Sequence, residues 1–258
     1  MESILELKNI SYAYHNLEGE TKALSDISFS IAPGEFAAIV GPSGCGKSTL
    51  LSIIAGLLRP EQGEITIRGM PLSDSRTNIG YMLQHDHLFE WRTIYRNVLL
   101  GLEIRHELSA ATKAKADELL ELYGLKRFSN AKPSELSGGM RQRASLIRTL
   151  IQDPELLLLD EPFSALDYQT RLNVGDDIGQ IIRQTGKTAL LVTHDLSEAV
   201  SLADRVFILT QRPATIAQTV PIIFDLEEDT PMKRRNAPEF KTYFNLIGKE
   251  LNQDETHI

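Results

Sequence analysis

The sequence predicts an α/β fold in which a core sheet carries an N-terminal antiparallel β subdomain and an inserted α-helical subdomain. Residues 1–40 alternate between apolar and polar side chains, which is typical of half-buried strands. Residues 36–40 form a continuous apolar run that leads through a glycine-rich loop into a helical pattern, and helical patterns dominate residues 88–149. We expect a single domain over residues 1–225 and a short, partly helical tail over residues 226–258.

The expected elements follow from the spacing of apolar residues along the chain. Runs with a period of two, or short continuous apolar runs, predict strands at residues 4–14, 23–31, 36–40, 63–69, 78–84, 155–160, 188–193 and 205–210. Helical spacing predicts helices at residues 48–58, 93–104, 111–124, 170–185, 196–203 and 240–251. Two glycines, Gly175 and Gly179, weaken the prediction of the helix at residues 170–185 because glycine has a low helix propensity.

Composition excludes several classes of protein. The net charge of −8 disfavours binding to a nucleic-acid backbone, and we expect no nucleic-acid partner. A single cysteine cannot form an internal disulfide, which favours a reducing compartment. The start MESILELKNI lacks the features of a signal peptide, and no apolar run approaches the roughly 20 residues that span a bilayer.

The stretch GPSGCGKSTL at residues 41–50 matches the phosphate-loop pattern G-x-x-x-x-G-K-[ST] between a buried strand and a helix. Backbone N–H groups of such a loop bind phosphate oxygens, and the N-terminus of the helix favours the same anion. We expect Lys47 to reach the β- and γ-phosphates of ATP and Ser48 to bind Mg²⁺. The expected nucleotide-binding residues of this stretch are Gly41, Pro42, Ser43, Gly44, Cys45, Gly46, Lys47, Ser48 and Thr49.

The segment LLLLDE at residues 156–161 places two carboxylates at the end of a buried strand. In a protein with a phosphate loop, Asp160 can hold the Mg²⁺ ion and Glu161 can polarise the attacking water. Together the two motifs predict an ATPase.

Further motifs resemble those of ATP-binding-cassette (ABC) ATPases. LSGGM at residues 136–140 is similar to the family's signature motif, and other family elements follow in the expected order over residues 4–210. The resemblance implies a role in nucleotide binding for Tyr14, Ser137, Gly138, Gly139 and Asp167, with Tyr12 as the alternative to Tyr14 for stacking on adenine. It also implies that Gln84 and His194 act with Glu161 in catalysis, and that Gln84 joins Ser48 and Asp160 at the metal.

The family resemblance implies a set of partners. Two copies of the chain would pack head to tail, so that ATP lies between the phosphate loop of one copy and the signature motif of the other. A transmembrane permease would hold the protein at the cytoplasmic face of the membrane, and a periplasmic or lipid-anchored solute-binding protein would act indirectly. Phe89 and Trp91 suit either a docking groove for the permease or the core of the helical subdomain.

The chain most resembles ATPase subunits of nitrate, sulfonate and taurine importers, through its length, its segment after Gln84 and RPATI at residues 212–216. Glu90 and Met140 depart from the pattern, Glu90 where proline is expected and Met140 where many cassettes have glutamine. Alternatives are an importer of another small solute such as a thiamine precursor, an exporter, a soluble cassette of the iron–sulfur assembly type, and a non-enzymatic nucleotide-binding module. The cluster His85, Asp86 and His87 is not expected to bind a metal.

Overall fold

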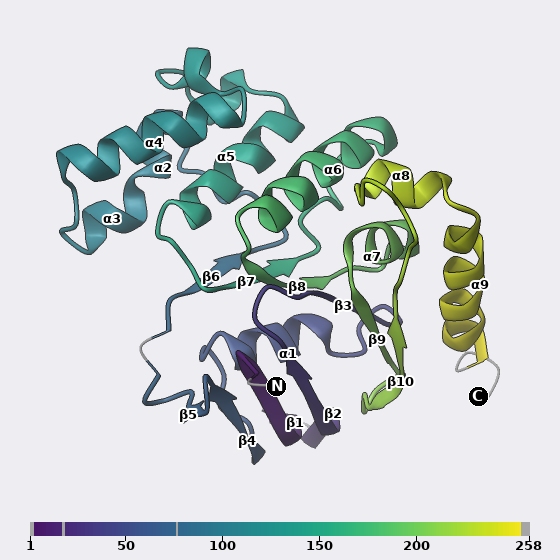
Figure 1. The fold of residues 1–258 in the computed structure, drawn as a ribbon. Coiled ribbons are helices and arrows are strands. Elements are labelled where there is room, and N and C mark those ends of the chain that lie inside the picture. Colours follow the sequence, from purple (N-terminus) through teal and green to yellow (C-terminus); the bar gives the residue numbers. More distant parts are fainter. Residues whose placement is uncertain (1–2, 17–18, 76, 254–258) are drawn as a thin grey trace.

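The computed structural model describes residues 3–16, 19–75 and 77–253. Parts of the expected domain (residues 1–2, 17–18 and 76) and the end of the expected tail (residues 254–258) lie outside the described residues. Two sheets are stacked with helices between and around them (Figure 1). The N-terminal antiparallel sheet has the order β2-β1-β4-β5, formed by Gly19–Ile31, Leu5–Asn16, Gln62–Ile67 and Met70–Pro71.

The core sheet has the strand order β10-β9-β3-β8-β7-β6. Its strands are β10 (Ile216–Pro221), β9 (Arg205–Leu209), β3 (Phe36–Val40), β8 (Thr188–Val192), β7 (Leu156–Asp160) and β6 (Ile79–Met82). Successive residues of β3 point to opposite faces, so that Phe36 and Ala38 join one hydrophobic cluster while Ala37 and Ile39 join the other. This double burial explains the continuous apolar run in the sequence.

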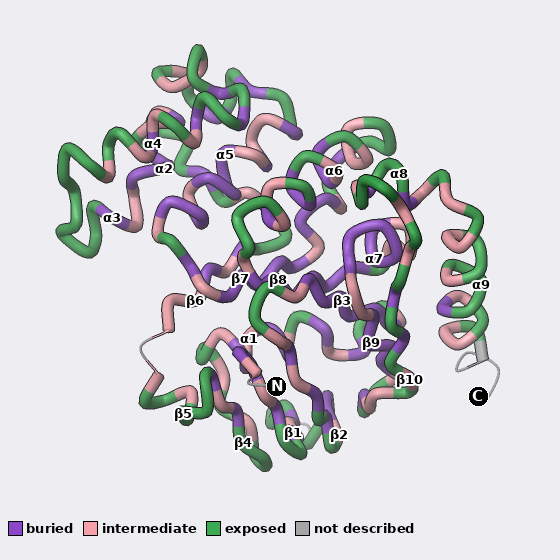
Figure 2. Tube along the Cα trace, in the orientation of Figure 1, coloured by how far each residue is buried: buried purple, intermediate pink, exposed green. Residues whose placement is uncertain are grey.

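Helices cover both faces of the core sheet, and burial concentrates along the strands between them (Figure 2). On one face, α1 (Lys47–Ile54) packs between the core sheet and the N-terminal sheet. On the other face lie α5 (Gly138–Leu150), α6 (Tyr168–Gln184) and α7 (Leu196–Leu202). The two faces therefore have separate hydrophobic clusters that share the core strands.

The helical segment between β6 and β7 lies on the side of the core sheet away from the N-terminal sheet (Figure 1). It contains α2 (Ile94–Val98), α3 (Leu100–Ile104), α4 (Ala110–Leu122), two short 3-10 turns (Lys126–Phe128 and Pro133–Glu135) and α5. Ser109 begins α4 with a capping box: its hydroxyl accepts from Thr112 N–H at 3.1 Å, while Thr112 Oγ1 accepts from Ser109 N–H at 2.8 Å. Ser137 caps α5 by accepting from Met140 N–H.

Besides the short strand β5 and the two 3-10 turns, the structure adds a strand and a helix that the sequence did not predict. Strand β10 pairs antiparallel with β9 at the edge of the sheet, where it is only half buried, and its weak apolar pattern explains why it was missed. Helix α8 (Pro231–Asn236) precedes α9 (Pro238–Gln253) in the tail. The buried Arg234 holds α8 in place by donating a hydrogen bond to the Ala203 carbonyl at 2.7 Å and by forming an ion pair with Asp229. Helix α9 packs on the core through Ile247, which is fully buried.

The helix predicted at residues 170–185 is present as α6, which is continuous through both of its glycines despite the low helix propensity of glycine. Lack of space explains why residue 179 is a glycine, because a Cβ atom there would lie 2.4 Å from Leu202 Cδ2 and 3.3 Å from Pro231 Cγ. At Gly175 a Cβ atom would meet only Phe163, at an ordinary contact distance of 3.8 Å. Close packing of α6 against α7 and α8 thus disfavours a side chain at residue 179 and tolerates alanine at residue 175.

We therefore expect opposite effects from two alanine substitutions on this helix. Gly179→Ala should lower the free energy of unfolding by about 1–3 kcal/mol, since an added methyl overpacks the buried Leu202. Gly175→Ala should raise it by up to about 1 kcal/mol, through helix propensity alone. Chemical denaturation of both variants tests this, and equal effects at the two positions would contradict the packing argument.

Candidate active site

A cavity of about 620 Å³ opens where the C-terminal ends of β3, β7 and β8 meet. It brings together residues that lie far apart in the sequence: Tyr14, Ala23, Ser43, Gly44, Gly46, Lys47, Ser48, Thr49, Gln84, Glu161, His194 and Arg212. Parallel strands end at the same edge of a sheet, so the loops that follow them converge there.

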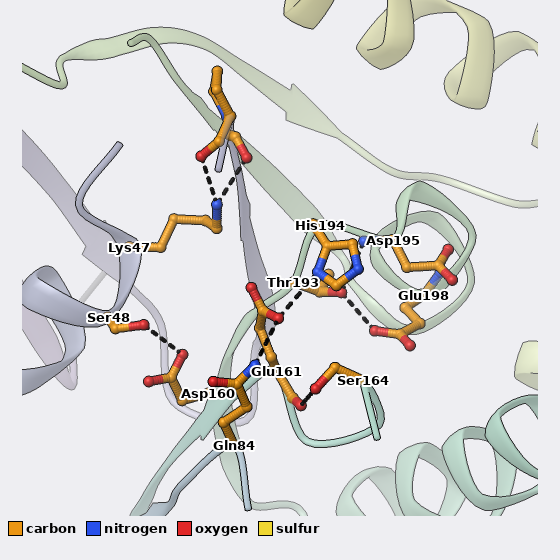
Figure 3. Close-up of polar contacts among 12 residues, drawn as sticks. Lys47, Ser48, Gln84, Asp160, Glu161, Ser164, Thr193, His194, Asp195 and Glu198 are labelled. Atoms are coloured by element: carbon orange, nitrogen blue, oxygen red, sulfur yellow. Dashed lines mark hydrogen bonds and ion pairs between the residues drawn. The ribbon is translucent and has the colours of Figure 1, made fainter. Parts of the chain in front are cut away.

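The phosphate loop forms the floor of the cavity. Lys47 is buried, and its ammonium group donates to the carbonyls of Gly41 at 2.8 Å and Pro42 at 2.9 Å (Figure 3). Gly46 has φ of +124°, and a Cβ atom there would lie 2.9 Å from Leu24 Cδ2, so glycine is required at the start of α1. The Cys45 side chain is buried in the apolar cluster on the α1 side, and burial raises the pKa of its thiol.

Ser48 and Asp160 meet at the edge of this floor. Ser48 Oγ donates to Asp160 Oδ1 at 3.0 Å, and the Tyr81 hydroxyl lies 3.3 Å from Asp160 Oδ2 (Figure 3 shows the first of these). Burial raises the pKa of Asp160, and it also raises the pKa of Tyr81 to about 12. A hydroxyl and a carboxylate are the hard oxygen ligands that Mg²⁺ prefers, so the donor set present here fits that ion.

Glu161 lies beside Ser48 and Asp160 and is contacted from two other loops. Its Oε2 is 3.0 Å from His194 Nδ1 and accepts a hydrogen bond from Gln84 Nε2 at 3.3 Å (Figure 3). The backbone of Glu161 has φ of +43°, a strained conformation for a residue with a side chain, and it is held by donation to the Val192 carbonyl at 2.8 Å. Glu161 therefore contacts both of the other residues expected to be catalytic.

Tyr14 lines the same cavity as Glu161 and His194. Its hydroxyl is 2.9 Å from Thr49 Oγ1, and its ring remains 44% exposed and available to a flat ligand. Tyr12 does not line the cavity and instead packs against the second hydrophobic cluster, with its ring edge-on to Tyr14. The geometry favours Tyr14 over Tyr12 for stacking.

The signature residues do not line this cavity, and neither does Asp167. Ser137, Gly138 and Asp167 are exposed at the N-termini of α5 and α6. A Cβ atom at Gly139 would lie 2.8 Å from Thr170 Cγ2, so this glycine allows α5 to pack closely on α6. Within one chain, two groups of expected nucleotide-binding residues thus occupy different surfaces.

Arg212 lines the cavity and was not among the predicted site residues. Its Nε donates to the Gly44 carbonyl at 3.1 Å, and its loop is fastened to β2 by Ala214, whose N–H donates to the Ala23 carbonyl at 2.9 Å. The sequence offered only the segment RPATI as a signal, without indicating that it folds back over the phosphate loop.

The adjacent His85, Asp86 and His87 have structural contacts instead of a metal-like arrangement. The two histidine rings lie edge to face, and Asp86 forms an ion pair with Arg141 at 2.9 Å. Burial raises the pKa of Asp86, but the hydrogen bonds from Arg141 and from Leu88 N–H, together with the positive charges of Arg141 and Arg148, outweigh burial and the pKa is lower than usual. Across residues 3–16, 19–75 and 77–253 no group of three or more His, Cys, Asp or Glu side chains is placed to hold a metal.

Glu198, in the first turn of α7, is a buried carboxyl close to the cavity. Burial raises its pKa from 4.5 to about 7, although the Thr193 hydroxyl opposes this by donating to Oε2 at 2.6 Å (Figure 3). Between these two pH values the folded chain keeps a proton that the unfolded chain releases. The stability of the protein therefore falls as the pH rises through this window.

Replacement of Glu198 by glutamine should remove this pH dependence. Glutamine keeps an acceptor for the Thr193 hydroxyl but cannot ionise. As the pH rises from 4.5 to 8, the free energy of unfolding of Glu198→Gln should therefore increase relative to that of the parent, by up to about 3 kcal/mol. Urea unfolding at pH 5, 6.5 and 8 measures the difference. Parallel pH profiles of the two proteins would show that Glu198 is not the group responsible.

Comparisons of the sequence with known proteins give a consistent result. The sequence pattern of the ABC transporter family matches residues 24–164. The chain is 47% identical to the Bacillus subtilis protein YtlC, named an uncharacterized ABC transporter ATP-binding protein, over 98% of this chain and 97% of YtlC. It is 40% identical to the aliphatic sulfonates import ATP-binding protein SsuB of Bacillus licheniformis (92% and 90% of the chains) and 39% identical to the nitrate import ATP-binding protein NrtD of Synechocystis (98% and 96%).

The fold is also similar to solved structures. A dimeric structure of the ATP-binding cassette MJ0796, in a post-hydrolysis state bound to ADP and phosphate, matches with a TM-score of 0.74 and 32% identity over 86% of this chain and all of that one. The predicted fold class is thereby confirmed. Among the described residues, no helix is both long and apolar enough to cross a membrane.

Proposed function

Because this chain belongs to the ABC transporter family and is an ATP-hydrolysing subunit of its importer-like branch, we propose that it powers the uptake of a small solute through a separate permease. The contact of Glu161 with His194 at the edge of the phosphate-loop cavity is the observation that carries the proposal. A module that only bound nucleotide would not need a carboxylate held at the γ-phosphate end of the cavity. The resemblance found in the motifs is confirmed at the level of the family.

In the proposed reaction Glu161 polarises the water that attacks the γ-phosphate. A carboxylate accepts hydrogen bonds, so His194 carries its proton on Nδ1 and orients Glu161 by donating to it at 3.0 Å. Lys47 would release its two loop carbonyls and move to the β- and γ-phosphates. Ser48, Gln84 and Asp160 would hold Mg²⁺, which neutralises phosphate charge when bound.

A second copy of the chain is the partner that would complete the site. Ser137, Gly138 and Asp167 are exposed but lie outside the cavity of their own chain, and the family relative MJ0796 is dimeric. A head-to-tail homodimer would bring the signature residues of one copy over the phosphate loop of the other. ATP binding would favour the closed dimer and hydrolysis would favour the open one.

The solute is proposed to be a small anion, such as a sulfonate, taurine or a nitrate-like compound. Support comes from relatives named as importers of aliphatic sulfonates and nitrate, at 40% and 39% identity. A solute-binding protein would select the compound and deliver it to the permease. The ATPase would act from the cytoplasmic face of the membrane and would not contact the solute.

The permease is proposed to dock beside Trp91. This side chain is 74% exposed, with its ring 4.7 Å from that of Phe89, so it does not belong to the core of the helical segment. The buried Asn97 shapes the loop by accepting from Phe89 N–H at 2.8 Å and donating to the Phe89 and Thr93 carbonyls at 3.1 Å. An aromatic pair on a firmly held loop suits a short helix of the partner.

Replacement of Glu161 by glutamine should stop turnover without preventing ATP binding. The amide cannot act as a base, so the rate of phosphate release should fall at least about 100-fold, and an ATP-bound dimer should accumulate on size-exclusion chromatography. Lys47→Ala is the matched control: it should lose ATP affinity and fail to dimerise. Unchanged turnover in Glu161→Gln would refute the assignment of this carboxylate.

Replacement of Trp91 by alanine should separate the ATPase from its permease. We expect Trp91→Ala to keep the ATPase rate of the isolated subunit but to lose co-purification with membrane subunits encoded beside it. Leu122→Ala is the control, since Leu122 is also exposed (61%) but lies on α4. If both variants co-purify as well as the parent does, the docking surface lies elsewhere. Co-purification with soluble scaffold proteins would instead favour an iron–sulfur assembly role.

A further inference from the structure

Arg171, near the start of α6, joins two loops that flank the cavity. Its Nη1 donates to Asp195 Oδ2 at 3.2 Å, and its Nη2 donates to the backbone carbonyls of Leu166 at 3.2 Å and Ser164 at 3.5 Å. Asp195 directly follows His194, and residues 164–167 follow Glu161. The Arg171 guanidinium therefore contacts the residue directly after His194 and the residues three and five positions after Glu161.

The loop that carries His194 is fixed through its backbone. The His194 side chain is 54% exposed, so packing of the ring contributes little to its position. On one side of it Thr193 N–H donates to the Ile39 carbonyl at 3.1 Å. On the other side Asp195 Oδ1 caps α7 by accepting from Ser197 N–H at 2.8 Å, which leaves Oδ2 for Arg171.

The loop after Glu161 is held in a similar way. Ser164 donates to the Glu161 carbonyl through both its N–H at 3.2 Å and its hydroxyl at 3.0 Å. Its own carbonyl, and that of Leu166, face the Arg171 guanidinium. Arg171 N–H in turn donates to the Asp167 carbonyl at 2.8 Å, which places the helix start and the loop in one hydrogen-bonded unit.

Arg171 contributes more to the relative position of the two loops than to the free energy of folding. Its side chain is mostly buried, and Nε is enclosed without a hydrogen-bond partner within residues 3–16, 19–75 and 77–253. An incompletely satisfied buried cation adds little net stability, because its desolvation offsets the attraction. What the planar guanidinium provides is a fixed spacing between a carboxylate and two carbonyls, which a lysine cannot reproduce.

We propose that Arg171 is a positioning residue for ATP hydrolysis, which sets His194 relative to Glu161 by tying Asp195 to the loop of residues 164–167. This inference rests on the proposed function and extends it to the dimer. Asp167, at the end of the loop, is exposed where a second copy would approach. A shift of that loop by the partner copy would thus reach His194 through Arg171.

The test compares two arginines of α6 in the full chain. Arg183 also donates to a backbone carbonyl, that of Leu202 at 2.7 Å, and also pairs with a carboxylate, Asp204 at 2.9 Å, but these partners belong to neither of the two loops that Arg171 joins. Arg171→Met and Arg183→Met therefore remove similar contacts at different places. Measurements are ATP affinity, the rate of phosphate release at saturating ATP, and the melting temperature.

We expect Arg171→Met to lower kcat by about 10- to 100-fold with ATP affinity unchanged, the loss typical of a catalytic group displaced by about 1 Å. Arg171→Lys should be intermediate, and Arg183→Met should keep the parent kcat. Asp195→Asn, which preserves the cap of α7, should also lower kcat. It should add no further loss to Arg171→Met, because both substitutions break the same link.

Two results overturn the proposal: an unchanged kcat in Arg171→Met, or an equal fall of kcat in Arg183→Met. If Arg171→Met does not fold, Arg171→Lys and Asp195→Asn carry the same test, and an unchanged kcat in both overturns it. Failure of the proposed hydrolytic role of Glu161 is recognised separately, because Glu161→Gln would then keep the parent rate of phosphate release.

Discussion

The site depends on the parallel pairing of β3, β8 and β7. Their register aligns Ile39 with Val192 and Val192 with Asp160, so the phosphate loop, the segment after Asp160 and the segment after Val192 leave the sheet at the same level. All three strands are buried on both faces, and a slip of one residue would reverse every side chain between the two hydrophobic clusters. The hydrophobic packing therefore fixes the relative height of Lys47, Glu161 and His194.

Around this fixed edge, the polar groups divide into a buried floor and an exposed rim. Lys47 and Asp160 are buried and hydrogen-bonded within the chain, so they can bind phosphate and metal without a rearrangement of the sheet. Gln84, His194 and Tyr14 are exposed on loops or at a strand end. These exposed side chains can move when a nucleotide, a docking partner or a second copy binds, without disturbing the core.

The signature residues belong to a different structural unit. Gly139 allows α5 to approach α6, and Ser137 caps α5, so their placement depends on the packing of those helices and not on the cavity. The N-terminus of α6 carries Asp167, four residues before Arg171. Helix α6 therefore carries both Asp167, on the surface proposed to meet a second copy, and Arg171, which contacts the loop of His194. This continuity gives the proposed dimer a direct physical connection to the catalytic pair.

The sequence by itself determined the parts of the protein that are local in the chain. GPSGCGKSTL, LLLLDE and LSGGM each encode a strand end or helix start whose chemistry follows from neighbouring residues, and their order predicted the fold class and the ATPase family. Only the tertiary structure showed that Tyr14 lines the cavity while Tyr12 packs against a hydrophobic cluster, that Trp91 is exposed, and that Arg212 contacts the phosphate loop. It also placed Arg171 between two loops and raised the pKa of Glu198. Each of these depends on burial or on partners distant in sequence, which neither spacing nor propensity can specify.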